Sequence, residues 1–229
     1  MAAPRADRGR LAADGQFWGL SSRASAGLLV IPFAGALLVG LAALQNDLYY
    51  GLVREDRLLE WLQFDAYVAT TVFAVAAAVR LERGAKRLSA VTFAAVALCA
   101  LLSAGEEISW GQRLFGFDPP ESLEELNRQE ELNVHDVVEV QGKVNLALAL
   151  ASLYGLAAPW LLRRRLLVVP PAALASAFFV MLAYTAARAA FFPHPGHGLA
   201  KFSEWPETCF AAAIALFTVL AWRKADDPE

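Results

Sequence analysis

Six long, mostly apolar blocks recur along the chain, and polar segments separate them. They cover about residues 25–45, 61–80, 88–105, 143–162, 166–188 and 204–222. Each block is long enough to cross a bilayer core of about 30 Å at about 1.5 Å per helical residue. The blocks are rich in Ala and Leu and do not alternate, which favours helices over a membrane barrel. The pattern predicts an all-α polytopic membrane bundle of about six transmembrane helices.

Charges between the blocks predict the topology. Thirteen of the 20 basic residues but only 6 of the 23 acidic residues lie in the alternate segments 1–25, 80–87, 163–165 and 222–229. Because cytoplasmic loops carry the excess of Lys and Arg, we expect both termini in the cytoplasm. The remaining loops, 46–60, 106–142 and 189–203, are then extracytoplasmic. This acidic outer face, together with the absence of any nucleic-acid motif, argues against a nucleic-acid partner.

The first residues differ in composition from the rest of the chain. Residues 1–16 are small and charged, so we expect a disordered cytoplasmic arm, followed by one transmembrane domain over 17–229. Phe17 and Trp18 suit a membrane interface. The first block lacks a small-residue cleavage site and is expected to be retained. Cys99 and Cys209 lie in apolar blocks without a C-x-x-C motif and are expected to be ordinary buried thiols.

The longest polar segment, 106–142, follows the third block and is the expected location of function. Glu106 and Glu107 end that block, where the helix dipole disfavours acids, so a functional or specifically paired role is favoured. Arg113 and Arg188 are candidate partners. Asp118-Pro119-Pro120-Glu121 is a typical helix start, and a helix running to about residue 140 is expected. Its many charges predict an interfacial or re-entrant helix rather than a seventh span.

All three histidines of the chain lie in the predicted outer loops, near carboxylates. Glu131 and His135 are spaced i,i+4, which places both on one helix face. Imidazoles with carboxylates form the ligand set of a catalytic zinc ion, which lowers the pKa of bound water. The alternatives stay open. The helix dipole and a Ser203 cap also explain Glu204 and Glu207, and the remaining histidines, His194 and His197, also suit an exposed Pro/Gly turn.

One string carries a resemblance. Residues 105–113, GEEISWGQR, followed by Asn127-x-Gln129-x-Glu131-x-Asn133-x-His135, resemble a signature of a bacterial family of polytopic membrane proteins that has no assigned function. The resemblance implies location in the bacterial cytoplasmic membrane. A more distant comparison is with the membrane hydrolases that include alkaline ceramidases and progestin-and-adipoQ receptors, which hold zinc by three histidines. The chain departs from them, with six spans rather than seven and H-x-x-H in a loop.

These patterns support a leading hypothesis and a rival. The first is an extracytoplasmic-facing, metal-assisted hydrolase or transferase acting on a lipid or lipid-linked headgroup, with a divalent ion, zinc favoured, as cofactor. The rival is a non-catalytic assembly subunit, or a module that binds a lipid or protein partner. The candidate catalytic residues are Glu106, Glu107 and His135. The candidate metal ligands are Glu107, Glu131, His135, His194, His197 and Glu207. The candidates for substrate binding or charge pairing are Gln112, Arg113, Asn133 and Arg188.

Overall fold

The computed structural model describes residues 5–54, 57–116, 138–162, 166–191 and 200–226 of the 229 residues. Every regular element among the described residues is helical. Six helices are long and apolar enough to cross a membrane, and they begin near residues 22, 46, 87, 142, 172 and 204. The prediction of an all-α bundle with six transmembrane helices is therefore confirmed.

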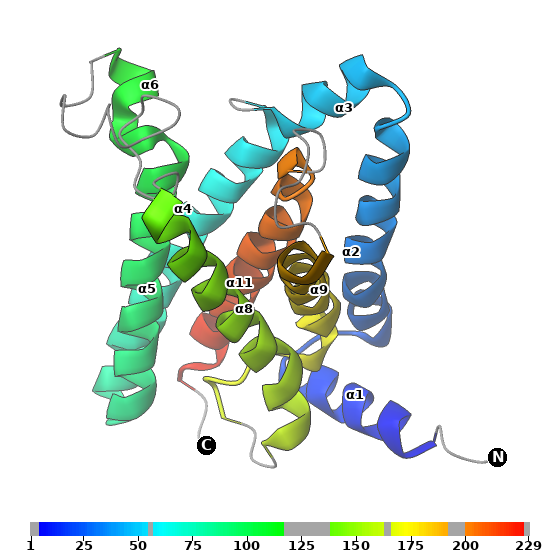
Figure 1. The fold of residues 1–229 in the computed structure, drawn as a ribbon. Coiled ribbons are helices and arrows are strands. Elements are labelled where there is room, and N and C mark those ends of the chain that lie inside the picture. Colours follow the sequence, from blue (N-terminus) through cyan, green and yellow to red (C-terminus); the bar gives the residue numbers. More distant parts are fainter. Residues whose placement is uncertain (1–4, 55–56, 117–137, 163–165, 192–199, 227–229) are drawn as a thin grey trace.

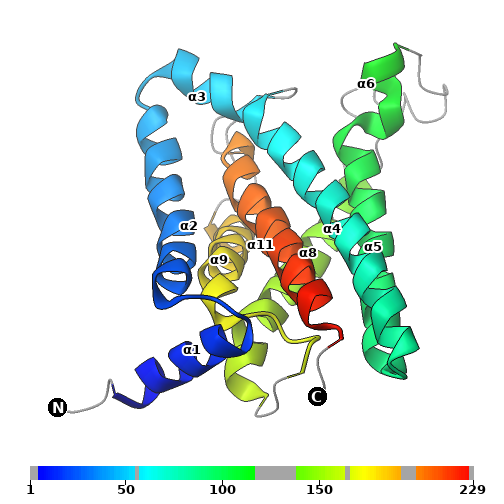
Figure 2. The ribbon, with the colours of Figure 1, turned by 180° about the vertical axis from the view of Figure 1, so that it is seen from behind.

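The long helices run alternately between the two ends of the bundle (Figures 1 and 2). In chain order they are α2 (Ser22–Ala42), α4 (Leu58–Arg83), α5 (Arg87–Glu107), α8 (Val138–Leu161), α9 (Ala175–Phe191) and α11 (Glu204–Lys224). Short helices α3 (Asn46–Val53) and α6 (Gln112–Phe115) lie at opposite sides of the same end, here called the α3–α6 end. Both chain termini lie at the other, here called the terminal end.

The centre of the bundle is α11, which packs against α4, α9 and α2 and is the most enclosed of the six long helices. Helix α4 also packs along α5. Alanines with no exposed surface, Ala74, Ala77 and Ala221, lie in the core with the rings of Phe93 and Phe217. Small residues let helix backbones approach closely where lipid supplies no hydrophobic drive between helices.

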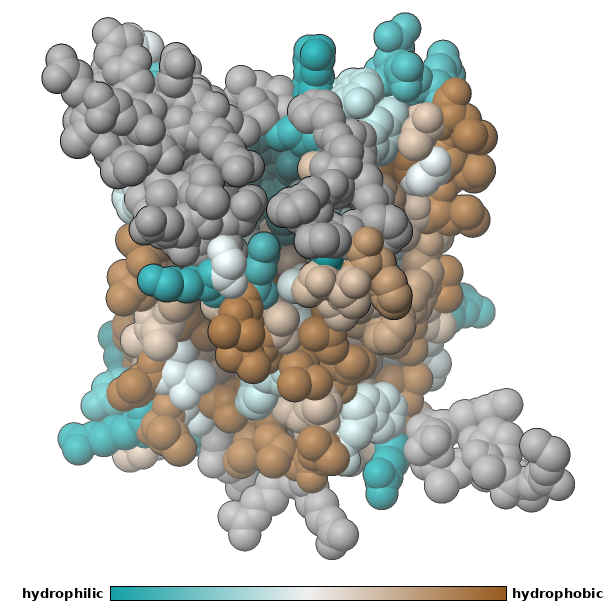
Figure 3. All heavy atoms as spheres, viewed as in Figure 1, coloured by the Kyte–Doolittle hydropathy of each residue, from teal (hydrophilic) through white to brown (hydrophobic). Residues whose placement is uncertain are grey.

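The surface is arranged as a bilayer requires. Large apolar side chains such as Leu38, Val72 and Leu98 are more than half exposed. Apolar residues dominate the middle of the face shown in Figure 3, and hydrophilic residues lie mainly toward the two ends. An apolar band of this kind matches the hydrocarbon core of a membrane.

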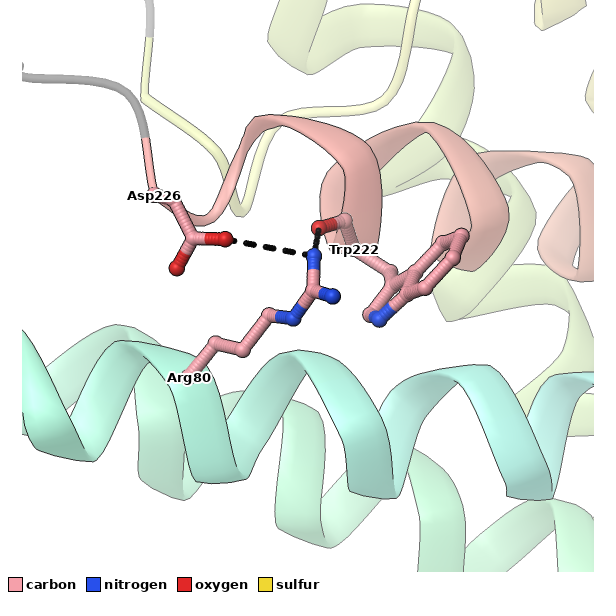
Figure 4. A network of polar contacts seen from close by, with 3 residues as sticks. All are labelled: Arg80, Trp222 and Asp226. Carbon is pink, nitrogen blue, oxygen red and sulfur yellow. Dashed lines mark hydrogen bonds and ion pairs between the residues drawn. The ribbon is translucent and has the colours of Figure 1, made fainter.

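At the terminal end, a polar network joins α4 to α11 (Figure 4). The Arg80 guanidinium donates to the Trp222 carbonyl oxygen at 3.1 Å, lies 4.5 Å from the centroid of the indole ring, and is 3.3 Å from Asp226. A cation over an aromatic face gains electrostatic energy in addition to the hydrogen bond. The network fixes the register between these two helices.

The N-terminal segment differs from the expectation of disorder. Residues Arg5–Phe17 form helix α1, which lies across the terminal end (Figures 1 and 2). The Ala172 amide donates to Asp14 Oδ2 at 2.8 Å, and Trp18 is buried in the core at 4% exposure. These two long-range contacts hold a helix that its composition alone would leave marginal.

The fifth span begins later than the predicted residue 166. The 3₁₀ helix η2 (Ala172–Leu174) follows Pro170 and Pro171 and leads into α9. Proline lacks an amide donor and is tolerated only in a first helical turn, so the helix starts just beyond the pair. The interfacial helix expected from Asp118 falls outside the described residues, except for 138–140, which belong to α8.

Candidate functional site at the α3–α6 end

The chain makes a strained turn directly after Glu106 and Glu107. Ser109, Trp110 and Gly111 all have positive φ, at 47°, 52° and 86°. The left-handed conformation costs about 1–2 kcal/mol for each residue with a side chain. Ser109 is fully buried in this conformation. Strain of this kind persists only where surrounding contacts impose it, and it is concentrated at functional sites.

The turn folds Trp110 back over the end of α5. Its indole Nε1 donates to Glu106 Oε1 at 2.7 Å. The ring lies so close to Gly105 that a Cβ at this position would be 2.9 Å from it. Glycine at 105 is therefore required for the contact, and the contact fixes the Glu106 carboxylate. The Gly-Glu-Glu-x-x-Trp part of the motif thus has a local structural explanation.

Glu107, the next residue, faces into the bundle. The buried Tyr67 phenol on α4 interacts electrostatically with both Glu107 on α5 and Glu207 on α11. Two of the candidate carboxylates, 100 residues apart in the sequence, therefore lie within electrostatic range of the same side chain, on different helices. Both carboxylates are half-buried. In a medium of low dielectric constant such charges interact strongly.

One turn from Glu207, Glu204 is bound by α4. Gln63, which is only 1% exposed, donates through Nε2 to Glu204 Oε2 at 2.9 Å and to the Glu204 carbonyl oxygen at 3.3 Å. The Thr208 hydroxyl donates to the same carbonyl at 2.6 Å. Glu204 also interacts electrostatically with Glu207 and Glu60. The helix dipole alone is therefore an insufficient explanation of Glu204.

Helix α9 contributes the cation. Arg188 hydrogen-bonds to the phenol oxygen of Tyr184, as does the Ser203 side chain, and the same phenol interacts with Glu207. The Tyr184 hydroxyl also donates to the Ala200 carbonyl at 3.3 Å. Ser203 makes no side-chain cap of α11, so the capping explanation of this residue is wrong. Its hydroxyl is used in the contact with Tyr184 instead.

These contacts join side chains from four helices, α4, α5, α9 and α11. We call the group the polar cluster, and its members are Gln63, Tyr67, Glu107, Tyr184, Arg188, Glu204 and Glu207. It combines carboxylates, phenols and one guanidinium at the α3–α6 end of the bundle. Such a set can bind a polar group, accept a proton and donate one.

The sequence-predicted site residues divide into three groups. Glu107, Glu207 and Arg188 lie in the polar cluster. Glu106 lies beside it, bound to Trp110, while Gln112 begins α6 and Arg113 follows. The remaining candidates fall outside the described residues, and they are Glu131, Asn133, His135, His194 and His197.

Within the described part of the chain, no group of three or more His, Cys, Asp or Glu side chains could hold a metal ion. Catalytic zinc needs three protein ligands and one open position, so the described residues do not make such a site by themselves.

Four residues of the polar cluster were not among the predicted site residues: Gln63, Tyr67, Tyr184 and Glu204. All lie within apolar blocks. One available signal was spacing, because Gln63 and Tyr67 are four residues apart and follow Glu60 on one face of a helix. Polar residues inside a span usually face the bundle interior.

Comparison with known proteins adds no further assignment. No protein-family model, curated protein or solved structure matches the chain. The functional argument therefore rests on the chemistry of the polar cluster.

Proposed function

We propose that the protein is a membrane enzyme, a hydrolase or transferase, that acts on the headgroup of a lipid or lipid-linked substrate at the α3–α6 end. We assign this end to the extracytoplasmic side of a bacterial cytoplasmic membrane, because the terminal end carries most of the basic residues that the structure describes. The site lies close to the depth at which lipid headgroups meet the hydrocarbon core.

The observation that supports this proposal is that carboxylates of two spans, Glu107 and Glu207, lie within electrostatic range of the buried Tyr67 on a third span, beside the 2.9 Å hydrogen bond from Gln63 to Glu204. Polar and ionisable groups are costly inside a membrane and are retained there chiefly for function. A purely structural role would need far fewer of them than the seven side chains of the polar cluster. The strained turn beside Glu107 supports the same interpretation.

In the proposed reaction, one carboxylate removes a proton from the attacking water or acceptor hydroxyl, and the other protonates the leaving group. Paired carboxylates in unlike environments commonly divide acid and base roles in this way. Tyr67 holds the two in register. Arg188 binds an anionic group of the headgroup, since guanidinium pairs with phosphate in a bidentate geometry. Glu106, bound to Trp110, positions the end of α5.

A divalent ion, with zinc favoured, completes the proposal on sequence grounds. The imidazoles of His135, His194 and His197, with Glu131, would be its ligands, which leaves Glu107 and Glu207 as the acid–base pair. When bound, such an ion would lower the pKa of its bound water, so that the carboxylate base would remove the proton of that water more readily. Asn133 and Gln112 would bind the polar parts of the headgroup.

The direct test is lipid turnover. The purified protein is reconstituted in nanodiscs of bacterial polar lipid extract, and the lipids are compared by mass spectrometry before and after incubation. We expect a headgroup-modified lipid with wild-type protein and a rate at least about 100-fold lower with Glu107→Gln or Glu207→Gln, the typical contribution of general acid–base catalysis.

Asp47→Asn is the matched control, because Asp47 is an exposed acid on α3 at the same end of the bundle. It should leave turnover within about twofold of wild type. Equal turnover in all four proteins, or none in the wild type with and without added zinc, would overturn the enzymatic proposal. The second result would favour the rival, a non-catalytic subunit or binding module.

A further inference from the structure

A pocket of about 710 Å³ lies at the terminal end, on the opposite side of the bundle from the polar cluster. Helix α1 forms one wall, and the end of α8 with the chain after it forms the other. The volume lies within the range of about 300–1,000 Å³ typical of small-molecule sites. None of the contacts of the polar cluster reaches it.

The lining of the pocket is amphipathic. Arg10, an exposed residue of α1, is on the polar side. The apolar lining includes Phe17, Leu161 and Leu166. Asp14 also lines the pocket, and its Oδ2 accepts the Ala172 amide at 2.8 Å. That hydrogen bond engages the acid at the start of the fifth span, leaving Arg10 as the cationic side chain of the described lining.

The position of the pocket matches a membrane interface. Trp18 and Trp160 both line it, at the start of the transmembrane domain and near the end of α8. Tryptophan is concentrated where headgroups meet acyl chains. Ten of the 16 basic residues in the described part of the chain also lie in the segments at this end of the bundle. Juxtamembrane Lys and Arg attract anionic lipids.

From the pocket's shape, charge and position we infer that it is a binding site for an anionic phospholipid, with the phosphate at Arg10 and the acyl chains on the apolar lining. The lipid fills the gap between α1 and α8 and holds α1 against the bundle. Lipid binding at this pocket is independent of the proposed reaction, so the inference stands even if the proposed reaction is refuted.

The test is native mass spectrometry, which counts the lipids that stay bound to the protein. The protein is released from detergent micelles that contain equal amounts of dioleoyl phosphatidylglycerol and dioleoyl phosphatidylcholine. Wild-type protein should retain the anionic lipid preferentially. Arg10→Gln should reduce that preference about fivefold, the effect of one basic side chain at a lipid surface. Arg23→Gln is the matched control, an exposed arginine at the same end that does not line the pocket.

A second variant tests the cavity rather than the charge. Ala13→Trp would fill the pocket from α1 and should reduce retention of both lipids about tenfold, with the thermal unfolding midpoint in detergent confirming a folded protein. Unchanged lipid preference in Arg10→Gln, or unchanged retention in folded Ala13→Trp, would overturn the inference. Loss of bound phosphatidylglycerol on addition of about 10 mM inorganic phosphate would also overturn the inference, because it would indicate a simple ion site.

Discussion

The contact between Gln63 and Glu204 allows a quantitative test of the polar cluster. Gln63→Leu removes the donor at nearly constant volume, and Glu204→Ala removes the carboxylate acceptor. Gln63 also bonds the Glu204 carbonyl at 3.3 Å, and Glu204→Ala leaves that second bond intact. The coupling energy of the double-mutant cycle therefore isolates the 2.9 Å bond to Oε2.

The expected coupling energy is about 1–1.7 kcal/mol. Hydrogen bonds between membrane helices average about 0.6 kcal/mol and reach about 1.7 kcal/mol. A bond from an amide that is only 1% exposed belongs in the upper part of that range, because a hydrogen bond is electrostatically stronger in a medium of low dielectric constant than in water. The free energy of unfolding is measured for the four proteins by SDS titration in mixed micelles.

The matched control is the cycle of Arg87 and Glu82, an ion pair at 3.6 Å whose side chains are 85% and 57% exposed. Exposed pairs of this kind contribute about 0–1 kcal/mol, so coupling here should be below about 0.5 kcal/mol. A Gln63–Glu204 coupling no larger than that of the control would refute the placement of Glu204 against α4. Replacement of Glu204 would then act through the helix dipole alone.

The remaining predictions concern packing and the metal. Gly155→Ala should destabilise the protein by about 1–3 kcal/mol, because a Cβ there would lie 2.5 Å from a phenyl ring of α9. Gly40→Ala, with open space around the Cβ, should change stability by less than about 1 kcal/mol; equal effects would contradict the α8–α9 packing. Gly105→Ala should lower the free energy of unfolding by about 1–2 kcal/mol in the wild-type background. In a protein that already carries Trp110→Ala, the same substitution should have almost no effect. Elemental analysis should find zinc in wild-type protein and lose it in His135→Ala; metal-free wild type would remove the metal from the proposal.

The apolar blocks predicted the spans well because lipid-facing helices must be apolar over nearly their whole length. The limits of α11 differ from the prediction by two residues. The start of α9 could not be located as well. Pro170 and Pro171 are a local signal for it, but the Ala172 amide also donates to Asp14, 158 residues away, and no local pattern encodes that contact.

The polar cluster was predictable only in part, for a related reason. Glu107 is conspicuous because an acid at a helix C-terminus is unfavourable. Tyr67 and Gln63 are polar residues within an apolar block, and their role depends on which face of α4 meets α5 and α11. That register is set by packing across three helices, so sequence spacing indicates a shared face without naming its partners.

The central claim is that Glu107 and Glu207 act as one acid–base site. The most direct test is the turnover rate in nanodiscs of both single Gln variants and of the double variant. Residues that act as a unit show strongly non-additive losses. If the two carboxylates act as such a unit, the double variant is no slower than the slower single variant, within about threefold. Losses that multiply in the double variant, or single variants as active as wild type, would contradict it.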